Sequence, residues 1–596
     1  MGGKRYRLPT EHDRQAYQAA AAALEAKRQA LWQAWGLDPV PDEPLPAQET
    51  LGFRVQRYGL TRWGDLFNPR QKLALITFAD KVRQAHTQML ERGADPALAK
   101  AVVTYLALAV DRVVDYMSNL CVHDNTQERT VHVFGRQALP MVWDYSELNP
   151  LSEAVGSWIS MFERRLLTTL GKLAAIDTSP ATALHGSATE LPWPDEYFDA
   201  VLTDPPYYDN VPYSDLSDFF YVWLKRTIGD LYPELFATPL APKAQEMVAD
   251  ASKAGGMEQA KRRFEEMLTQ SFREIHRVLH ADGIAVIVFA HKTTAAWETV
   301  ISALLDAGLY LTASWPVHTE MQARLRAQES AALASSIYMV CRKRVTQEVG
   351  EFGRVRREIE ARVRQKLAQF WDEGIRGADF YMSAIGPAVE AFGRYARVEK
   401  LSGEAVGVAE LLEYVRKVVS EFALQRILTP FPPSPYQGED WVGVGGVDAL
   451  TRFYLLWRWT YNAARVPYDE ARKLATGVGV ELTEHWGPGG LVQKQKEYVL
   501  VRAPLERAQD AHFVKQTEFR TMVDALQRAV HLWESGQSAR LQEHLTLTYG
   551  GNEAFWQVAQ AIAEVLPDGD REKQALQGLL YGRKGYAAVK QRLFED

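Results

Sequence analysis

The sequence predicts an α/β fold in which a partial, mostly parallel sheet is flanked by two mainly helical regions. Strand-length apolar runs alternate with helical repeats between residues 181 and 345, which is typical of a parallel sheet. On both sides of that stretch, over 1–180 and 346–596, apolar residues recur mostly at helical spacing. We find no internal repeat and no low-complexity tract. Three regions with these boundaries are therefore expected.

The first region is expected to contain helices joined by turn-rich segments. Residues 13–35 are Ala-rich and amphipathic, and the Pro-rich stretch 39–46 is expected to be a linker. Asn68 and Pro69 are typical of the N-cap and first turn of a helix. A further helix over about 96–120 carries three charges among apolar residues, Asp111, Arg112 and Asp115. We expect a paired, solvated or interdomain face, with a role beside a cofactor as the alternative.

The central region alternates between predicted strands and helices. Strands are expected at 182–185, 198–203, 284–289, 309–315 and 336–341. Helices are expected from Tyr213 to Leu224, from Phe264 to Leu279 with a stop at Asp282-Gly283, and over 297–307. The long segment 232–256, with three prolines and a Gly-Gly pair, is expected to be a lid or a surface loop. Ligands of such sheets bind at the carboxyl ends of the strands.

The tetrapeptide Asp204-Pro205-Pro206-Tyr207 directly follows the predicted strand 198–203. Its two prolines keep the backbone extended and lack N–H groups that would compete for the neighbouring carbonyls. An acid, two rigid carbonyls and an aromatic ring at a strand end can receive the exocyclic amino group of a flat base. The alternative is a turn that simply ends a strand.

The tetrapeptide and its surroundings resemble the second half of an S-adenosyl-L-methionine (AdoMet)-dependent amino-methyltransferase domain. More narrowly, DPPYYDNVPYSDLSDFFYVWLKR and YGLTRWGDLFNPRQ resemble a bacterial and archaeal family of large adenine-specific DNA methylases. That family carries a zinc-ribbon insertion and an uncharacterised conserved domain, and the resemblance covers most of residues 1–596. It implies a partial Rossmann-like AdoMet methyltransferase sheet and methylation of adenine N6 in DNA, in restriction-modification or defence.

The resemblance also implies roles for individual residues. The catalytic group is expected to be Asp204, Pro205, Pro206 and Tyr207. AdoMet is expected to contact Asp204 and, by their place after the predicted strand 182–185, Ser187 and Ala188. The extruded base is expected to stack on Tyr207, with the pocket wall formed by Tyr208, Asn210 or Tyr213. No metal is expected in the reaction.

Two features of the methyltransferase class are missing from the sequence. We find neither the glycine-rich turn after a first strand nor the acid that holds the AdoMet ribose, and the glycine cluster 443–446 follows a Pro-rich loop. One sheet strand precedes the tetrapeptide where three are needed. We therefore expect the C-terminal portion of a split or truncated enzyme, with a partner polypeptide supplying the glycine-rich strand. The alternatives are a cytosine-N4 or RNA methyltransferase, or a non-catalytic DNA-binding specificity subunit.

A net charge of −7 gives no overall attraction to nucleic acid, so DNA contact requires local basic surface. Residues 342–366 contain nine basic and four acidic residues and form either a solvated helix face or a DNA contact. Arg452, Arg458 and Arg465 alternate with aromatic residues, a pattern of either phosphate contact with stacking or ordinary core.

Cysteine content and hydropathy favour a cytoplasmic protein without a membrane segment. Cys121 and Cys341 are too few and too far apart for a zinc site or a disulfide framework, and each is expected to be a small buried residue. The longest apolar run, 101–110, is half the length of a membrane span, and no signal-peptide pattern occurs.

Overall fold

The computed structural model describes residues 7–592 except 49, 51, 177, 178, 180, 207–210, 251–253, 292, 319–334 and 429–445. The chain is mixed α/β and divides into two compact units. The first unit comprises Met1–Ser187 and Tyr208–Phe264, and the second comprises Ala188–Tyr207 and Glu265–Asp596. The predicted regions 1–180 and 346–596 each fall within one unit, whereas the predicted catalytic region 181–345 contributes to both.

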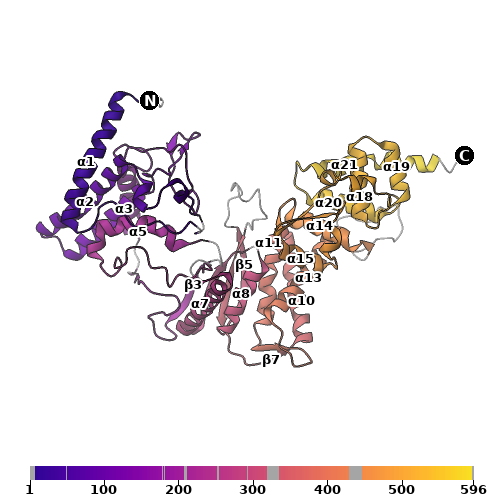
Figure 1. Cartoon of the computed structure of the whole chain (residues 1–596). Coiled ribbons are helices and arrows are strands. Elements are labelled where there is room, and N and C mark those ends of the chain that lie inside the picture. Colours follow the sequence, from indigo (N-terminus) through magenta and orange to yellow (C-terminus); the bar gives the residue numbers. More distant parts are fainter. Residues whose placement is uncertain are drawn as a thin grey trace. The chain divides into compact units, whose positions relative to one another are not determined.

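The first unit is mainly helical (Figure 1). Its elements are α1 (Glu11–Trp35), η1 (Val55–Tyr58), η2 (Trp63–Leu66), α2 (Pro69–Glu91), α3 (Pro96–Val114), β1 (His123–Asp124), β2 (Arg129–Thr130), η3 (Ser160–Leu167), α4 (Thr168–Ala174), α5 (Tyr213–Ile228) and η4 (Gly229–Leu231). Helix α7 (Met257–Val278) begins in this unit and ends in the second.

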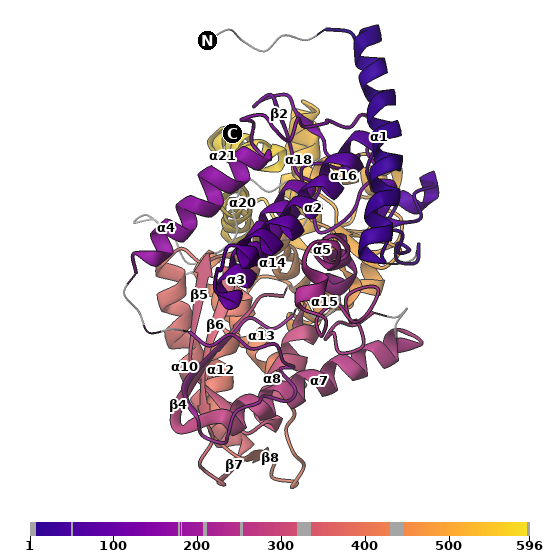
Figure 2. The same cartoon turned by 90° about the vertical axis from the view of Figure 1, so that its left-hand side faces the viewer.

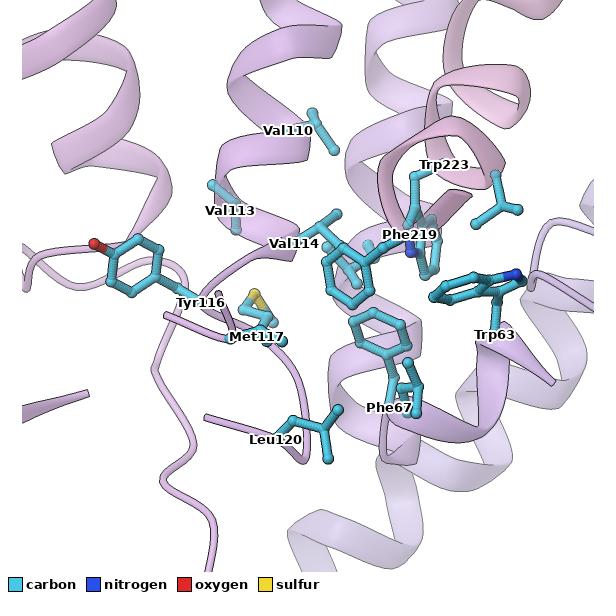
Figure 3. Packing of buried hydrophobic residues seen from close by; sticks show 14 of the residues in the cluster. Trp63, Phe67, Val110, Val113, Val114, Tyr116, Met117, Leu120, Phe219 and Trp223 are labelled. Atoms are coloured by element: carbon cyan, nitrogen blue, oxygen red, sulfur yellow. The ribbon is translucent and has the colours of Figure 1, made fainter. Parts of the chain in front are cut away.

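The core of the first unit lies where α2, α3 and α5 pack together. Figure 3 shows four aromatic rings gathered there. The ring centroids of Phe67 and Trp223 lie 5.3 Å apart, and those of Trp63 and Phe219 lie 6.2 Å apart, both in edge-to-face geometry. The predicted cap of α2 is confirmed, because the Asn68 side chain accepts a hydrogen bond from the backbone N–H of Gln71 at 3.0 Å. Rigid aromatic packing thus fixes α5, the helix that follows the DPPY segment in the chain.

Elements of the second unit include a four-stranded sheet and many helices. They are β3 (Phe198–Thr203), β4 (Leu279–Phe289), α8 (Thr294–Asp306), β5 (Leu309–His318), β6 (Ser335–Lys343), β7 (Val349–Glu351), α10 (Phe352–Asp372), α11 (Gly377–Ser383), α12 (Ile385–Phe392), β8 (Arg397–Glu399), α13 (Val408–Leu428), α14 (Ala449–Tyr461), β9 (Val466–Pro467), α15 (Tyr468–Gly477), η6 (Leu482–His485), β10 (Val492–Gln495), β11 (Tyr498–Val501), α16 (Pro504–Arg507), α17 (Ala511–Lys515), α18 (Met522–Glu534), α19 (Ser538–Leu547), α20 (Glu553–Val565) and α21 (Arg571–Arg592).

The sheet has the order β3-β4-β6-β5. Strands β3 and β4 are parallel, and β6 is antiparallel to both β4 and β5. Strands β3, β4 and β5 therefore run in one direction and β6 runs against them. Helices α8 and α12 pack against β5, and Figure 2 shows α10 and α12 beside the strands. At the opposite edge, β3 carries Leu202 with 75% of its surface exposed.

Two sequence predictions for this sheet are wrong. Residues 182–185 are exposed and have no regular secondary structure, because a strand needs a neighbour to pair with and the described sheet ends at β3. Asp282-Gly283 does not end a helix but lies inside β4, three and four residues after the first residue of the strand, Leu279. A Cβ at Gly283 would lie 2.9 Å from the carbonyl oxygen of Asp199 on β3. Glycine therefore permits a close approach of two strands, beside a register shift between Phe198 and Ala200.

Candidate functional site

The carboxyl ends of three strands meet at one edge of the sheet. Strand β3 ends at Thr203, which pairs with Ile287 of β4, and β4 ends two residues later at Phe289. Strand β5 runs in the same direction and ends at His318. Asp204, Pro205 and Pro206 follow β3 directly, so they lie at the edge where open α/β sheets bind their ligands.

Asp204 is exposed, whereas Pro205 behind it is buried and Pro206 is half-buried. Within the described part of the chain, no hydrogen bond or ion pair is recorded for the Asp204 carboxylate. A packed proline thus holds the backbone in place while the carboxylate oxygens stay accessible as hydrogen-bond acceptors. Groups that such oxygens can hold include exocyclic amines.

The other predicted base-binding residues are either outside the described residues or part of the first unit, whereas Asp204 belongs to the second. Tyr207, Tyr208 and Asn210 lie outside the described residues. Tyr213 is the first residue of α5 in the first unit, and 54% of its surface is exposed. The described part of the predicted site is therefore Asp204-Pro205-Pro206.

The predicted AdoMet contacts do not form a cofactor site by themselves. Ser187 is half-buried and Ala188 is exposed, and the division between the two units falls between them. Their predicted position depended on a strand at 182–185, which is absent. Within the described four-stranded sheet, β3 is the terminal strand, so no second strand end of that sheet lies beside Asp204 on its open side.

His291 follows β4 and is packed into the start of α8. Its Nδ1 accepts hydrogen bonds from the Thr293 backbone N–H at 3.1 Å and lies 2.8 Å from the Thr293 hydroxyl. The Trp297 indole donates to the His291 carbonyl at 2.8 Å. The next residue, Lys292, lies outside the described residues. The His291 ring therefore helps to shape the first turn of α8.

A buried carboxylate that the sequence did not indicate joins this edge to the helical part of the same unit. Glu470 of α15 accepts hydrogen bonds from the Thr294 backbone N–H at 3.0 Å and from its hydroxyl at 3.1 Å. The Arg416 guanidinium of α13 lies 2.9 Å from Glu470, and Lys473 lies 3.4 Å away. Burial opposes ionisation, but these cations hold the pKa of Glu470 below its ordinary value. The carboxylate also meets the positive N-terminal end of α8.

Most basic residues of 342–366 are used in structural contacts. Arg342 donates to the Asp282 carbonyl at 2.6 Å, Arg354 pairs with Glu358 at 3.2 Å, and Arg364 pairs with Glu360 at 3.0 Å.

The aromatic stripe of α14 is core, because Phe453, Tyr454 and Trp457 are fully buried. Arg458 is also buried and pairs with Glu572 at 2.9 Å. The structural alternative therefore describes Arg342, Arg354, Arg364 and Arg458, whereas Arg356 and Arg452 form no ion pair within the described residues.

The predicted lid segment is tied to α5 within the first unit. Asp218 accepts hydrogen bonds from the backbone N–H of Ala241 at 2.8 Å and from the Lys243 ammonium at 2.7 Å. Glu246 accepts one from the backbone N–H of Ser214 at 2.7 Å. Desolvation raises the pKa of Asp218 to about 6 although Lys243 acts in the opposite direction.

The charges of α3 are more buried than the sequence suggested. The Asp111 side chain is buried, one of its oxygens has no hydrogen-bond partner, and burial raises its pKa well above the ordinary value. Asp115 is paired, with Arg112 at 2.5 Å and His132 at 3.5 Å. The expectation of a paired face therefore holds for Asp115. Asp111 is instead a buried carboxyl without a recorded ion pair among the described residues.

In the part of the chain that the structure describes, no group of three or more His, Cys, Asp or Glu side chains could hold a metal ion. Over the same residues, no helix combines the length and apolar character that crossing a bilayer requires. Both cysteines are buried free thiols. No family model, no curated protein and no solved structure matches this chain.

Proposed function

We propose that this chain is the base-holding part of an AdoMet-dependent DNA amino-methyltransferase that acts on adenine N6. The observation that carries the proposal is the exposed Asp204 carboxylate at the carboxyl end of β3, directly followed by a buried Pro205. A partner polypeptide would supply the glycine-rich strand that binds AdoMet, and the substrate would be DNA.

The arrangement of the sheet supports this proposal. Strand β6 lies between β4 and β5 and runs against both, whereas β3, β4 and β5 share one direction. The Asp-Pro-Pro segment follows β3, at the carboxyl end where open α/β sheets bind their ligands.

The chemistry of the chain's own groups follows from the base amine. The lone pair of an exocyclic amine is delocalised into the ring, so the amine is a poor nucleophile. Hydrogen bonds from its two N–H groups to the Asp204 carboxylate and the Pro205 carbonyl would localise that lone pair and orient it. AdoMet would supply the methyl group. The departing proton would pass to Asp204 or to water.

The open edge of β3 supports the proposed partner. In the described sheet β3 pairs only with β4, and its outer side presents backbone groups that another strand can bond. Leu202 on this strand is 75% exposed, and an apolar side chain in this position is available to pack against a further element. We propose that a parallel strand of the partner pairs there and brings the AdoMet-binding turn beside Asp204.

The first test is methyl transfer from labelled AdoMet by the chain together with the proposed partner. Asp204→Asn preserves shape but removes the charge, so label transferred to duplex DNA should fall by about 100-fold or more. Asp199→Asn on the same strand is the matched control, because Asp199 is also exposed but lies at the opposite end of β3. Undiminished transfer by Asp204→Asn would remove the catalytic assignment.

A parallel arm with RNA, and analysis of the modified base, separates adenine-N6 from RNA or cytosine-N4 methylation. Isothermal titration of AdoMet into the chain with and without the partner tests the shared cofactor site. Equal affinity in both titrations would argue against the partner's role.

A further inference from the structure

A large groove in the second unit lies beside α13 and is separate from the Asp-Pro-Pro segment. Its volume is about 1160 Å³, and it is lined by residues of α8, α10, α13, α14 and α15. Along α13 the lining extends from Ala409 to Leu424, which corresponds to about 22 Å at the rise of an α-helix. Figure 1 shows α10, α13 and α15 close together in this unit. The groove is thus long enough for an extended chain.

Cations along the groove lack acidic partners. Arg356 of α10, Lys417 of α13, Arg452 of α14 and Arg472 of α15 all line it. No carboxylate of the described residues lies within ion-pair distance of any of the four. In contrast, Arg416 in the same wall is neutralised by Glu470 at 2.9 Å. Four cations from four helices, none of them within ion-pair distance of a carboxylate of the described residues, therefore line one groove.

Arg452 has an unused hydrogen-bond donor beside the groove. Its side chain is half-buried, and its Nε is buried without a hydrogen-bond partner. The single contact recorded for its guanidinium is a long one, from Nη2 to the Val478 carbonyl at 3.5 Å. Burying such a donor unpaired is costly, and a phosphate oxygen is the partner that a guanidinium binds best.

Two aromatic rings add a second type of contact. Phe352 and Tyr414 line the groove and are half-buried, and the Arg356 guanidinium lies 5.5 Å from the Tyr414 ring centroid. Cations that follow a backbone and rings that stack on bases are the combination that binds single-stranded nucleic acid.

The groove also contains carboxylates, and these limit the choice of ligand. Glu410 and Glu421 are paired with Lys400 and Arg364, at 3.0 Å and 3.4 Å. Glu298 and Glu413 are not in recorded ion pairs. These two can accept hydrogen bonds from exocyclic base amines, which a ligand carrying phosphate alone would not satisfy.

We propose that this groove binds a single-stranded segment of nucleic acid, with Lys417, Arg452 and Arg472 on its phosphates. The groove includes Thr294, the first residue of α8, and α8 follows β4 beyond the edge at which Asp204 lies. A nucleic-acid strand bound in this groove would therefore extend from the sheet edge at which the proposed function places the extruded base. The choice of nucleic acid rests on the proposed function, but binding can be measured without AdoMet or a partner.

The experiment measures fluorescence anisotropy of labelled single-stranded oligonucleotides of about 20 nucleotides with the full chain, in separate DNA and RNA arms. The groove variant combines Lys417→Gln, Arg452→Gln and Arg472→Gln. The control variant combines Arg357→Gln, Lys515→Gln and Arg571→Gln, which remove the same charge from exposed positions of the same unit outside the groove. Thermal unfolding of each variant monitors folding.

The groove variant should bind about tenfold or more weakly, and the slope of log affinity against log salt should fall by about 2, since single strands lose about 0.7 per phosphate contact. The control variant should bind like the unaltered chain, and the preferred polymer identifies the nucleic acid. Equal binding by the groove and control variants, or no binding by the unaltered chain, would overturn the proposal. Asp204→Asn should bind normally, so loss of methyl transfer with retained binding separates failure of the proposed function from failure of the groove.

Discussion

At the residue scale, Asp218 combines full burial with an ion pair to Lys243 at 2.7 Å. Desolvation dominates over that pair and raises the pKa of Asp218 to about 6, from an ordinary value of 3.8. Between these two values the folded state keeps a proton that the unfolded state has released. The free energy of unfolding must therefore fall as the pH rises through this window.

Between pH 4 and pH 6.5 the free energy of unfolding should fall by at most about 3 kcal/mol, because one pKa unit corresponds to 1.36 kcal/mol. Asp218→Asn does not titrate and should remove this part of the pH dependence. The measurement is thermal or denaturant unfolding of both proteins across that pH range. Parallel pH profiles for the two proteins would contradict the assigned shift.

The protonation state of Asp218 should also affect how firmly the segment around Ala241 and Lys243 is held. Above about pH 6 its charged form holds Lys243 and the backbone of Ala241, whereas its protonated form holds them less strongly. The amides of Ala241 and Lys243 should therefore lose protection, relative to the intrinsic exchange rate at each pH, as Asp218 becomes protonated, which native-state hydrogen exchange can detect.

At the element scale, Arg226 fastens the linker around residues 38–43 to helix α5. Its fully buried guanidinium donates to the Asp38 carbonyl at 2.8 Å and to the Glu43 carboxylate at 2.9 Å. It also donates to the Val222 carbonyl at 2.9 Å. The fork of the guanidinium thus satisfies several acceptors that the linker and α5 leave open.

Arg226→Met should destabilise the first unit by about 3–5 kcal/mol, because Glu43 then stays buried without its cation. Arg226→Lys keeps the charge but not the fork and should show an intermediate loss. Arg164→Met is a suitable control, since Arg164 is 59% exposed and its partner Glu153 is 80% exposed. Denaturant unfolding followed by Trp fluorescence is the measurement. A loss no larger than the control's would show that the linker is held by other contacts.

Elements with a local signal were predicted well from sequence, and those that depend on distant neighbours were not. Apolar alternation predicted β3 with both of its ends, and Asn68-Pro69 predicted the start of α2. The strand at 182–185 failed because pairing, not apolar content, decides whether a strand forms. The sequence predicted that a helix ends at Gly283. In the structure this glycine permits a close approach to Asp199, and local sequence does not reveal such a tertiary contact.

The candidate site shows the same division. The Asp-Pro-Pro segment could be placed at a sheet edge, because its position depends only on the strand before it. Glu470 could not be found, since its partner Thr294 is 176 residues away and nothing local marks a helical glutamate as buried. The groove cations likewise come from four helices whose neighbourhood no sequence spacing reveals.

At the scale of the whole molecule, Glu470 connects the helical part of the second unit to the sheet edge. Three groups meet at its carboxylate: the N-terminus of α8, Arg416 of α13 and Lys473 of α15. Because its folded pKa lies below the ordinary value, its contribution to stability is present above the unfolded pKa and is lost as the pH falls.

Glu470→Ala should cost about 3–5 kcal/mol, because Arg416 is then buried without an anion. Glu470→Gln keeps an acceptor for the Thr294 N–H and should cost less. The sheet and the helical part should then unfold in separate transitions, and the Thr294 amide should exchange faster. Hydrogen exchange with mass spectrometry checks both. A single unchanged transition in Glu470→Ala would show that this contact does not couple the two parts.

The uncovered rim of the sheet at β3 has a practical consequence. A strand with an exposed leucine and unsatisfied backbone groups on one side is a template for edge-to-edge aggregation. Produced alone at high concentration, the protein should self-associate through this rim, and a lysine in place of Leu202 should suppress that association. Co-expression with a polypeptide that occupies the rim should yield soluble, monodisperse material.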